Sequence, residues 1–314
     1  MTTSAIAVHG LRKAFGDKTV LDGIDLEVPA GTVFSLLGPN GAGKTTTVNV
    51  LTTLTKADGG TVQVAGHDIA TQAKAVRSAI GVTGQFAAVD ELLTGRENLQ
   101  LMVDLTPAAS KGAVAELLER FDLVEAADKA ASTYSGGMRR KLDLAMTLVG
   151  DPRIIFLDEP TTGLDPRSRR TMWTIVRELV AGGVTIFLTT QYLDEADELA
   201  DQIAVLDKGR LVAHGAPDEL KRLIPGTHVR FRFGSAADLD EAARLFPNAT
   251  KDDDALSLRV PSDAGTKSVR ALLDRLDEAS LEAEEFSVHT PDLDDVFLTL
   301  TGHGTTDTAE VVAQ

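Results

Sequence analysis

A glycine-rich stretch constrains this chain more than any other part of its sequence. It is made up of Gly38, Pro39, Asn40, Gly41, Ala42, Gly43, Lys44, Thr45 and Thr46. The stretch matches G-x-x-x-x-G-K-[ST]; the apolar run before it predicts a buried strand, and residues 45–54 predict a helix. A glycine loop between a strand and a helix can hold a phosphate group, because backbone N–H groups and the positive helix end face the anion.

The residue types within the loop point to a nucleoside triphosphate. Gly38, Gly41 and Gly43 let the backbone turn and come close to the β-phosphate. Lys44 is expected along the β- and γ-phosphates, and the Thr45 hydroxyl at a Mg²⁺ ion. An ordinary glycine-rich turn is the alternative, and the flanking strand and helix argue against it.

Composition restricts the classes of partner. The chain has 314 residues, of which 43% are apolar, enough for two domains or for one domain with an appendage. Its formal net charge of −16 disfavours non-specific binding to nucleic acid or to an anionic bilayer. It has no cysteine, which excludes disulfides and thiolate metal sites.

The start of the sequence lacks the features of a secretion signal, and no apolar run reaches the ~18 residues of a membrane span. Any work at a membrane is therefore expected to need a partner.

Two domains and a tail are predicted. Residues 1–222 alternate strands and helices, and the apolar runs 154–157, 185–188 and 203–206 are typical of a parallel sheet buried on both faces. Residues 223–301 predict a small α+β domain of the split βαβ type. Residues 223–314 carry 8 Lys or Arg and 18 Asp or Glu, a net of −10, so most of the acidity lies there. Residues 302–314 are small and polar, and predict a disordered tail.

Two acids follow a buried strand and predict the hydrolytic centre. Asp158 and Glu159 come directly after the run 154–157, at the sheet edge where ligands bind in α/β folds. Asp158 is placed to hold Mg²⁺, and Glu159 is the candidate general base for the attacking water. A solvated acidic turn is the alternative, and the upstream phosphate loop argues against it.

The stretch Tyr134-Ser135-Gly136-Gly137-Met138 decides the family. Ser135 can cap a helix whose exposed N–H groups lie at its positive end. Beside the phosphate loop and the acidic pair, this stretch resembles the signature of ATP-binding-cassette (ABC) ATPases. The resemblance covers residues 5–222. It implies an α/β P-loop NTPase with a mixed sheet core and a helical subdomain, binding ATP and Mg²⁺.

The resemblance also implies roles for single residues. Phe15 would stack on adenine, with a core position at a strand end as the alternative, and Gln85 would reach Mg²⁺ and sense the membrane partner. Asp165 belongs to a loop that communicates between two subunits. Such ATPases work as head-to-tail homodimers, in which Ser135, Gly136 and Gly137 of one copy cover the nucleotide held by the other. A separate permease would hold the dimer at the cytoplasmic face of the membrane.

Gln191 departs from the general pattern, in which a histidine senses the γ-phosphate. An amide donates a hydrogen bond but cannot hold a proton, which leaves Glu159 as the base. The chain is similar to the daunorubicin-resistance branch of bacterial drug-export ATPases, in which a glutamine at position 191 is typical. The similarity lies in the stretches 81–86, 93–99, 134–144 and 189–197. The amphipathic stretch 291–302 resembles the C-terminal motif of that branch. Its apolar face either packs within the chain or serves dimerisation or regulation.

The leading interpretation is an ATPase subunit of a drug or lipid exporter, and three alternatives were weighed. A ribosome-acting ABC protein carries two cassettes per chain, and this chain has one. A DNA-repair ATPase interrupts its cassette with a long coiled coil, but residues 46–135 of this chain contain no heptad pattern. The negative net charge of this chain also does not suit DNA binding. An importer ATPase shares the same chemistry and differs only by the branch resemblance.

Overall fold

The computed structural model describes residues 4–301 except positions 86, 108, 111, 224–226 and 264. Within it the chain forms two compact units, Met1–Pro217 and Asp218–Gln314. The division lies within a helix, α8 (Pro217–Arg222), a few residues before the boundary predicted at residue 223. The tail predicted over residues 302–314 lies outside the described residues.

A mixed six-stranded sheet forms the centre of the first unit, in the order β10-β9-β3-β8-β7-β6. Its strands are β3 (Val33–Leu37), β6 (Ile80–Thr83), β7 (Ile154–Asp158), β8 (Thr185–Thr190), β9 (Gln202–Asp207) and β10 (Arg210–Gly215). Five strands run parallel, and β10 returns antiparallel to β9 through a hairpin. Every residue of β3, β7 and β8 is buried, as their continuous apolar runs predict.

A second, antiparallel sheet of the first unit has the order β2-β1-β4-β5. Its strands are β1 (Ser4–Phe15), β2 (Lys18–Pro29), β4 (Gly59–Val64) and β5 (His67–Asp68). The buried apolar residues of β1 and β2 face a core that they share with the central sheet and with α1 (Lys44–Leu51). Phe34 and Phe156 each lie 5.4 Å, between ring centroids, from Phe187 in that core.

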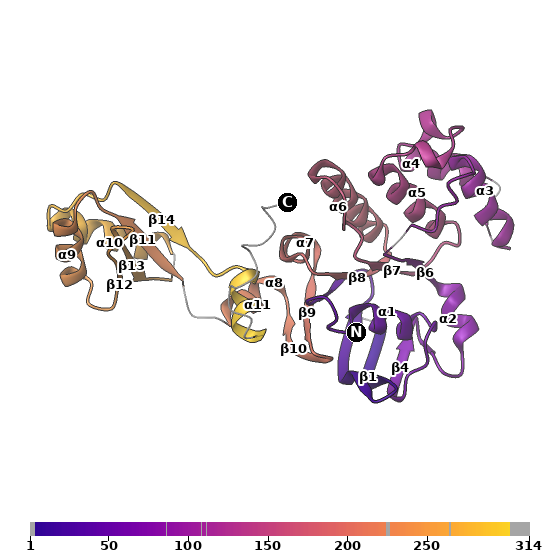
Figure 1. The fold of residues 1–314 in the computed structure, drawn as a ribbon, viewed down its shortest axis with the longest axis horizontal. Helices are drawn as coiled ribbons and strands as arrows, with labels where there is room; N and C mark the ends of the chain where they lie inside the picture. Colours follow the sequence, from indigo (N-terminus) through magenta and orange to yellow (C-terminus); the bar gives the residue numbers. More distant parts are fainter. Residues whose placement is uncertain are drawn as a thin grey trace. The chain divides into compact units, whose positions relative to one another are not determined.

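A helical region of the first unit packs around a second core (Figure 1). It is built from α3 (Gly95–Leu105), α4 (Ala113–Arg120), the short turns η1 (Val124–Ala126) and η2 (Ala131–Thr133), and α5 (Gly136–Leu148). The remaining helices of the unit are α2 (Ala73–Ala79), α6 (Pro166–Ala181) and α7 (Leu193–Leu199). Figure 1 shows α3, α4 and α5 gathered away from β1 and β4. The predicted mixed sheet with a helical subdomain is confirmed.

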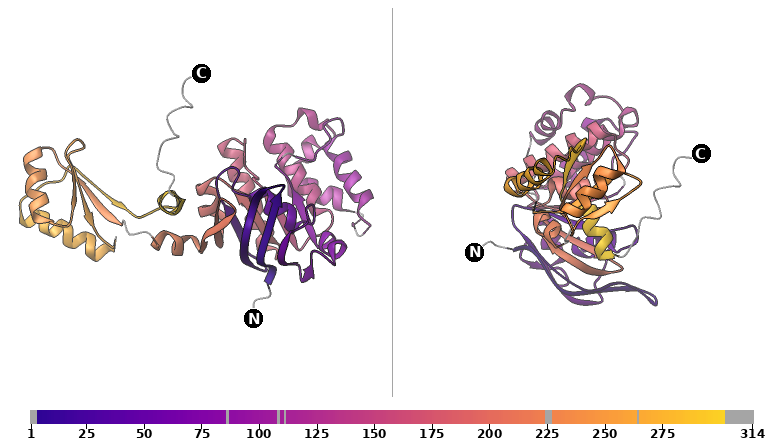
Figure 2. Two further views of the ribbon diagram at one scale, coloured as in Figure 1. Left: turned by 60° about the horizontal axis from the view of Figure 1, so that its bottom comes forward. Right: turned by 90° about the vertical axis from the view of Figure 1, so that its left-hand side faces the viewer.

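Among the described residues, the second unit contains a four-stranded antiparallel sheet in the order β12-β13-β11-β14 and three helices that follow α8 (Figure 2). Its elements are β11 (His228–Arg232), α9 (Ala236–Leu245), β12 (Thr250–Asp252), β13 (Ser257–Pro261), α10 (Thr266–Glu278), β14 (Glu285–His289) and α11 (Leu293–Thr301). The chain order βαββαβ and the sheet order are those of the split βαβ fold, as predicted. Val229, Phe231, Leu239 and Leu276 belong to its core. Leu293 and Val296 of α11 are buried, so the chain itself covers part of that helix's apolar face.

Candidate nucleotide-binding site

The predicted phosphate loop lies between β3 and α1. Gly43 comes directly before α1 with φ 113° and ψ 8°, in the left-handed region, and among the described residues no side chain caps the helix there. The first N–H groups of α1 therefore keep their hydrogen-bonding capacity for a ligand. Thr45, in the first turn of α1, is exposed.

Two glycines of the loop are required by close packing against neighbouring strands. A Cβ atom on Gly38 would lie 2.3 Å from the backbone oxygen of Leu206, and one on Gly43 would lie 2.8 Å from Leu21 Cδ2. The hairpin between β9 and β10 also contacts the loop, because Gly209 N donates to the backbone oxygen of Ala42 at 3.0 Å. A segment more than 160 residues further along the chain thus holds the loop in place.

A cavity of about 560 Å³ opens beside the loop. Its lining residues are Lys18, Thr19, Val20, Asn40, Gly41, Gly43, Lys44, Thr45, Thr46, Gln85, Glu159, Lys208 and Gly209. The structure therefore brings the loop together with Gln85 from the end of β6 and Glu159 from the end of β7. The residues from the start of β2 and from the β9–β10 hairpin were not predicted as part of the site.

A buried ion pair joins the loop to the predicted general base. Lys44 Nζ lies 3.2 Å from Glu159 Oε1, and the two side chains are 4% and 9% exposed. Lys44 also donates to the backbone oxygens of Gly38 at 2.8 Å and Pro39 at 3.2 Å. Glu159 adopts φ 49°, which is costly for a residue with a Cβ atom. The neighbouring segments therefore hold this carboxylate in a conformation that it would rarely adopt alone.

Neighbouring parallel strands set the positions of the second acid and of Gln191. Asp158 lies opposite Thr189 in the pairing of β7 with β8, and Thr189 Oγ1 donates to Asp158 Oδ1 at 2.5 Å. Glu159 N donates to the backbone oxygen of Thr189 at 3.1 Å. Gln191 directly follows β8 and is half-buried. Asp158 is 4% exposed, and neither it nor Gln191 is among the residues that line the cavity.

The signature residues line a different cavity, of about 620 Å³. Its lining residues are Asp122, Ser135, Gly137, Met138, Lys141, Asp165, Arg167, Ser168, Thr171 and Met172. Ser135 Oγ accepts from Met138 N at 3.2 Å and caps α5, whose first residue is Gly136. Asp165 caps α6, and the hydrogen bond from the Ser168 hydroxyl holds the pKa of its carboxyl below the usual range. Ser135 and Asp165 thus share one cavity, separate from that of the phosphate loop.

Phe15 ends β1 and is 54% exposed, which argues against the alternative of a core position. Lys13 Nζ lies 5.1 Å from the centroid of its ring. The ring is not among the residues that line the loop cavity, although Lys18, just beyond the following turn, is.

Comparison with known proteins identifies the family. A family profile described as "ABC transporter" matches residues 21–162. The daunorubicin resistance ATP-binding protein DrrA3 of Streptomyces coeruleorubidus is 50% identical over 307 residues, which cover 96% of this chain and 97% of the relative. The chain belongs to the ABC transporter family. Within it, the chain is of the daunorubicin-resistance type of ATP-binding protein, and the predicted resemblance is confirmed.

Further relatives and solved structures agree with this assignment. The daunorubicin/doxorubicin resistance ATP-binding protein DrrA of Streptomyces peucetius is 48% identical over 97% of this chain and 94% of its own length. A crystal structure of a nucleotide-free ATP-binding cassette from an ABC transporter has a TM-score of 0.64 at 28% identity, and covers 70% of this chain and 94% of its own. The protein is thus an ABC-type ATPase. Within the described residues, no helix is both long enough and apolar enough to cross a bilayer.

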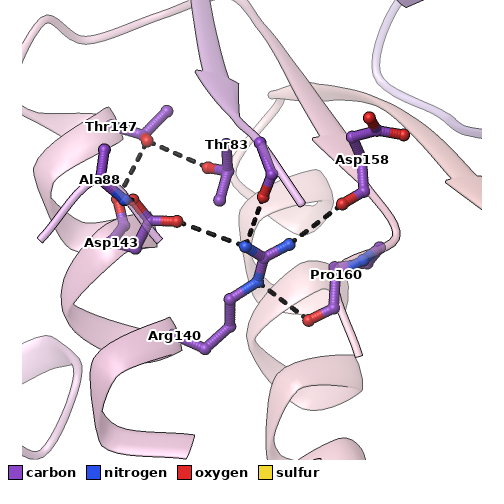
Figure 3. Close-up of polar contacts among 8 residues, drawn as sticks. Thr83, Ala88, Arg140, Asp143, Thr147, Asp158 and Pro160 are labelled. Atoms are coloured by element: carbon purple, nitrogen blue, oxygen red, sulfur yellow. Dashed lines mark hydrogen bonds and ion pairs between the residues drawn. The ribbon is translucent and has the colours of Figure 1, made fainter. Parts of the chain in front are cut away.

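Arg140 connects the signature helix of this ABC ATPase to the ends of two strands (Figure 3). The residue lies on α5 and is 6% exposed. Its Nη1 donates to the backbone oxygen of Gly84 at 2.6 Å, its Nε to that of Pro160 at 2.9 Å, and its Nη2 to that of Asp158 at 3.3 Å. These three carbonyls flank Gln85 and Glu159 in the chain. The guanidinium therefore fixes the backbone on both sides of Glu159 and on the N-terminal side of Gln85.

Asp143, one turn along α5, balances the buried charge of Arg140. Its Oδ2 lies 3.3 Å from Arg140 Nη1, and its Oδ1 accepts from Ala88 N at 2.9 Å. Burial raises the pKa of Asp143, against the hydrogen bond from Ala88 and the charge of Arg140. Beside the pair, the hydroxyls of Thr83 and Thr147 lie 3.0 Å apart (Figure 3). The stretch 134–144, which resembles the daunorubicin-resistance branch, contains Arg140, but the sequence carries no signal of the three carbonyls that the side chain reaches.

Gly38→Ala tests the close packing of the loop. We expect a loss of about 1–3 kcal/mol in the free energy of unfolding, because the new methyl group meets a backbone atom that cannot move aside cheaply. Nucleotide binding, followed with a fluorescent ATP analogue, should weaken as well. Gly112→Ala is the matched control, since a Cβ atom there meets nothing within 4 Å. Equal stability of the two variants would contradict the packing argument.

Arg140→Met tests the buried guanidinium. We expect a loss of about 3–5 kcal/mol in unfolding free energy, because Asp143 remains buried without its partner. The double variant Arg140→Met/Asp143→Leu should lose much less than the sum of the two single variants, since it leaves no uncompensated charge. Urea unfolding of all four proteins measures both effects. Additive losses would show that the two side chains do not act as a pair.

Proposed function

We propose that this ABC ATPase powers the export of an antibiotic or similar drug through a separate membrane-spanning permease. The observation that supports this is the extent of the similarity. Relatives named for daunorubicin resistance match 96% and 97% of the chain, and so include the second, acidic unit and not only the cassette. The predicted position at the cytoplasmic face of the membrane follows from a permease partner.

The loop cavity offers groups that suit MgATP. Uncapped N–H groups at the start of α1 and the Lys44 ammonium suit the phosphates. Thr45 and Gln85 line the same cavity, and with Asp158 they provide hydroxyl, amide and carboxylate oxygens, the donors that Mg²⁺ prefers. When bound, Mg²⁺ would neutralise charge on the phosphate oxygens. We therefore assign these three residues to the metal and residues 38–46 to the phosphates.

Glu159 is our candidate for the general base. Its buried carboxylate lies within the cavity, and its Oε2 accepts from Thr162 Oγ1 at 3.2 Å, while its Oε1 faces Lys44. These contacts orient the carboxylate toward the phosphate end of the site, where it can accept a proton from the attacking water. Gln191 would add an amide hydrogen bond near the γ-phosphate but cannot take up the proton.

The homodimer completes the proposed site. Ser135, Gly137 and Asp165 line a cavity separate from that of Lys44 and Glu159. A head-to-tail pair of chains would place the signature cavity of each copy over the loop cavity of the other. ATP would then stabilise the pair by contacts that exist only when the two copies are closed, and hydrolysis would remove them.

Export of a Nod factor or a related cargo is a second candidate function. The Nod factor export ATP-binding protein I of Paraburkholderia xenovorans is 39% identical over 96% of this chain and 98% of its own length.

Cells that express the chain with its permease should expel an anthracycline faster than cells with the permease and Glu159→Gln. ATPase activity without faster expulsion of the anthracycline would favour a different cargo, such as a lipid.

Glu159→Gln should abolish ATP turnover while preserving ATP-bound dimers. The amide keeps the shape of the side chain but cannot accept the proton. Phosphate release and light scattering with ATP measure the two properties, and Glu116→Gln, on the exposed side of α4, is the control. Sizeable ATPase activity in Glu159→Gln would show that another group is the base.

Gln191→His should be tolerated, with less than about a tenfold loss in turnover, which is about 1.4 kcal/mol in activation free energy. Histidine can donate the same hydrogen bond as the amide. The ATPase rate of the variant, compared with that of Gln191→Ala, measures this. A larger loss in the histidine variant would show that the site is adapted to the amide.

A further inference from the structure

The edge strand β14 of the second unit presents apolar side chains to solvent. It is the last strand of its sheet and pairs only with β11 among the described strands (Figure 1). All five of its residues are exposed, and Phe286 and Val288 are 51% and 43% exposed. These two side chains lie opposite Phe231 and Val229, and so belong to the sheet face that carries the helices. An open edge with apolar side chains favours pairing with another strand.

The opposite edge of the same sheet lacks this property. Strand β12 has three residues, Thr250–Asp252, and runs into the acidic turn of Asp253 and Asp254. A short, charged strand is a common protection against edge-to-edge pairing. Strand β14 contains neither proline nor lysine. The two edges therefore differ in the features that decide whether a strand accepts a partner.

The register determines which backbone groups β14 offers. Phe233 N donates to Leu256 O at 2.9 Å and Ser262 N to Thr227 O at 3.0 Å, so the odd-numbered positions of β11 face β13. Its even-numbered positions then face β14, where Arg230 lies opposite Ser287. Since in-plane groups alternate along a strand, the N–H and C=O groups of Phe286 and Val288 point away from β11, toward the open edge.

We propose that β14 pairs antiparallel with β14 of a second copy of this chain, about a two-fold axis at Ser287. In this register the outward backbone groups of Phe286 meet those of Val288 in the second copy, and the reverse. Each Phe286 side chain then lies beside a β-branched one, a favourable cross-strand pair. The strand Glu-Phe-Ser-Val-His is thus complementary to itself, as a two-fold interface requires.

Polar complementarity favours this register over its neighbours. Glu285 comes to lie opposite His289 of the second copy, on the sheet face without helices. In its own chain Glu285 lies 3.2 Å from Arg232, and His289 lies 3.3 Å from Asp295 and 4.8 Å, between ring centroids, from His228. A shift by two residues would instead place Glu284 opposite Val288 or Phe286 opposite Thr290. This interface needs no nucleotide, and so is independent of the function proposed above.

Cysteine cross-linking of the full chain tests the proposal, because the natural sequence has no cysteine. The two Ser287 residues would face each other in a non-hydrogen-bonded pair with Cα atoms about 4.5 Å apart, within the range that a disulfide spans. Without ATP, and at high salt to screen the acidic units, Ser287→Cys should form a covalent dimer upon mild oxidation. Pairing through β14 would hold the two thiols at an effective concentration on the order of millimolar. The covalent dimer should therefore form at least about tenfold faster than with Thr250→Cys on the opposite edge.

Phe286→Lys in the Ser287→Cys background tests the contact itself. The lysine places a charge on the apolar edge while the thiol stays in place, so covalent dimer formation should fall to the rate of Thr250→Cys. Sedimentation of Phe286→Lys without the added cysteine should show a shift toward monomer relative to the natural chain. Equal cross-linking of Ser287→Cys and Thr250→Cys, or cross-linking that Phe286→Lys leaves unchanged, would overturn the proposal.

Discussion

The Arg140 guanidinium lies in the protein interior, where its charge is stabilised by four oxygen atoms from three separate segments. Two segments lie at the ends of β6 and β7, and the third is its own helix, α5. Burial lowers the pKa of Arg140, while the nearby carboxylates of Asp143, Glu195 and Asp158 act in the opposite direction. The guanidinium stays charged, and the four oxygen atoms offset the cost of removing that charge from water. Because the carbonyl groups flank Gln85 and Glu159, the geometry of the proposed catalytic groups depends on this one side chain. It also depends on the helix that carries the signature.

The phosphate loop depends on a comparable long-range constraint. Gly38 and Gly43 lie against residues of β9 and β2, and the hairpin turn at Gly209 donates a hydrogen bond to the loop. Glu159 adopts a left-handed conformation beside the loop and pairs with Lys44. Strain of this kind persists only where the surrounding structure holds it. The buried parallel strands supply that support, since their ends place the loop, Asp158 and Gln191 at one edge of the sheet.

The two units use their sheets differently. In the first unit, β3, β7 and β8 are buried on both faces, and the proposed catalytic groups follow their carboxyl ends. In the second unit, helices cover one face of an antiparallel sheet, and one edge keeps exposed apolar side chains. The proposed ATP-bound dimer and the proposed β14 pairing therefore concern different surfaces.

The sequence alone determined the features that are local in the chain. The phosphate loop, the acidic pair after a buried strand, the cap at Ser135 and the alternation of strands and helices in the first unit depend on residues close in sequence. Short motifs and periodicity therefore predicted them. Only the tertiary structure decided that Lys18 and Lys208 line the loop cavity, that Arg140 reaches three carbonyl groups, and that Phe286 lies at an open edge. Each of these features depends on which distant segments become neighbours. Every residue has a backbone carbonyl, and many residue types can lie at a strand edge, so the sequence does not indicate which ones will be used.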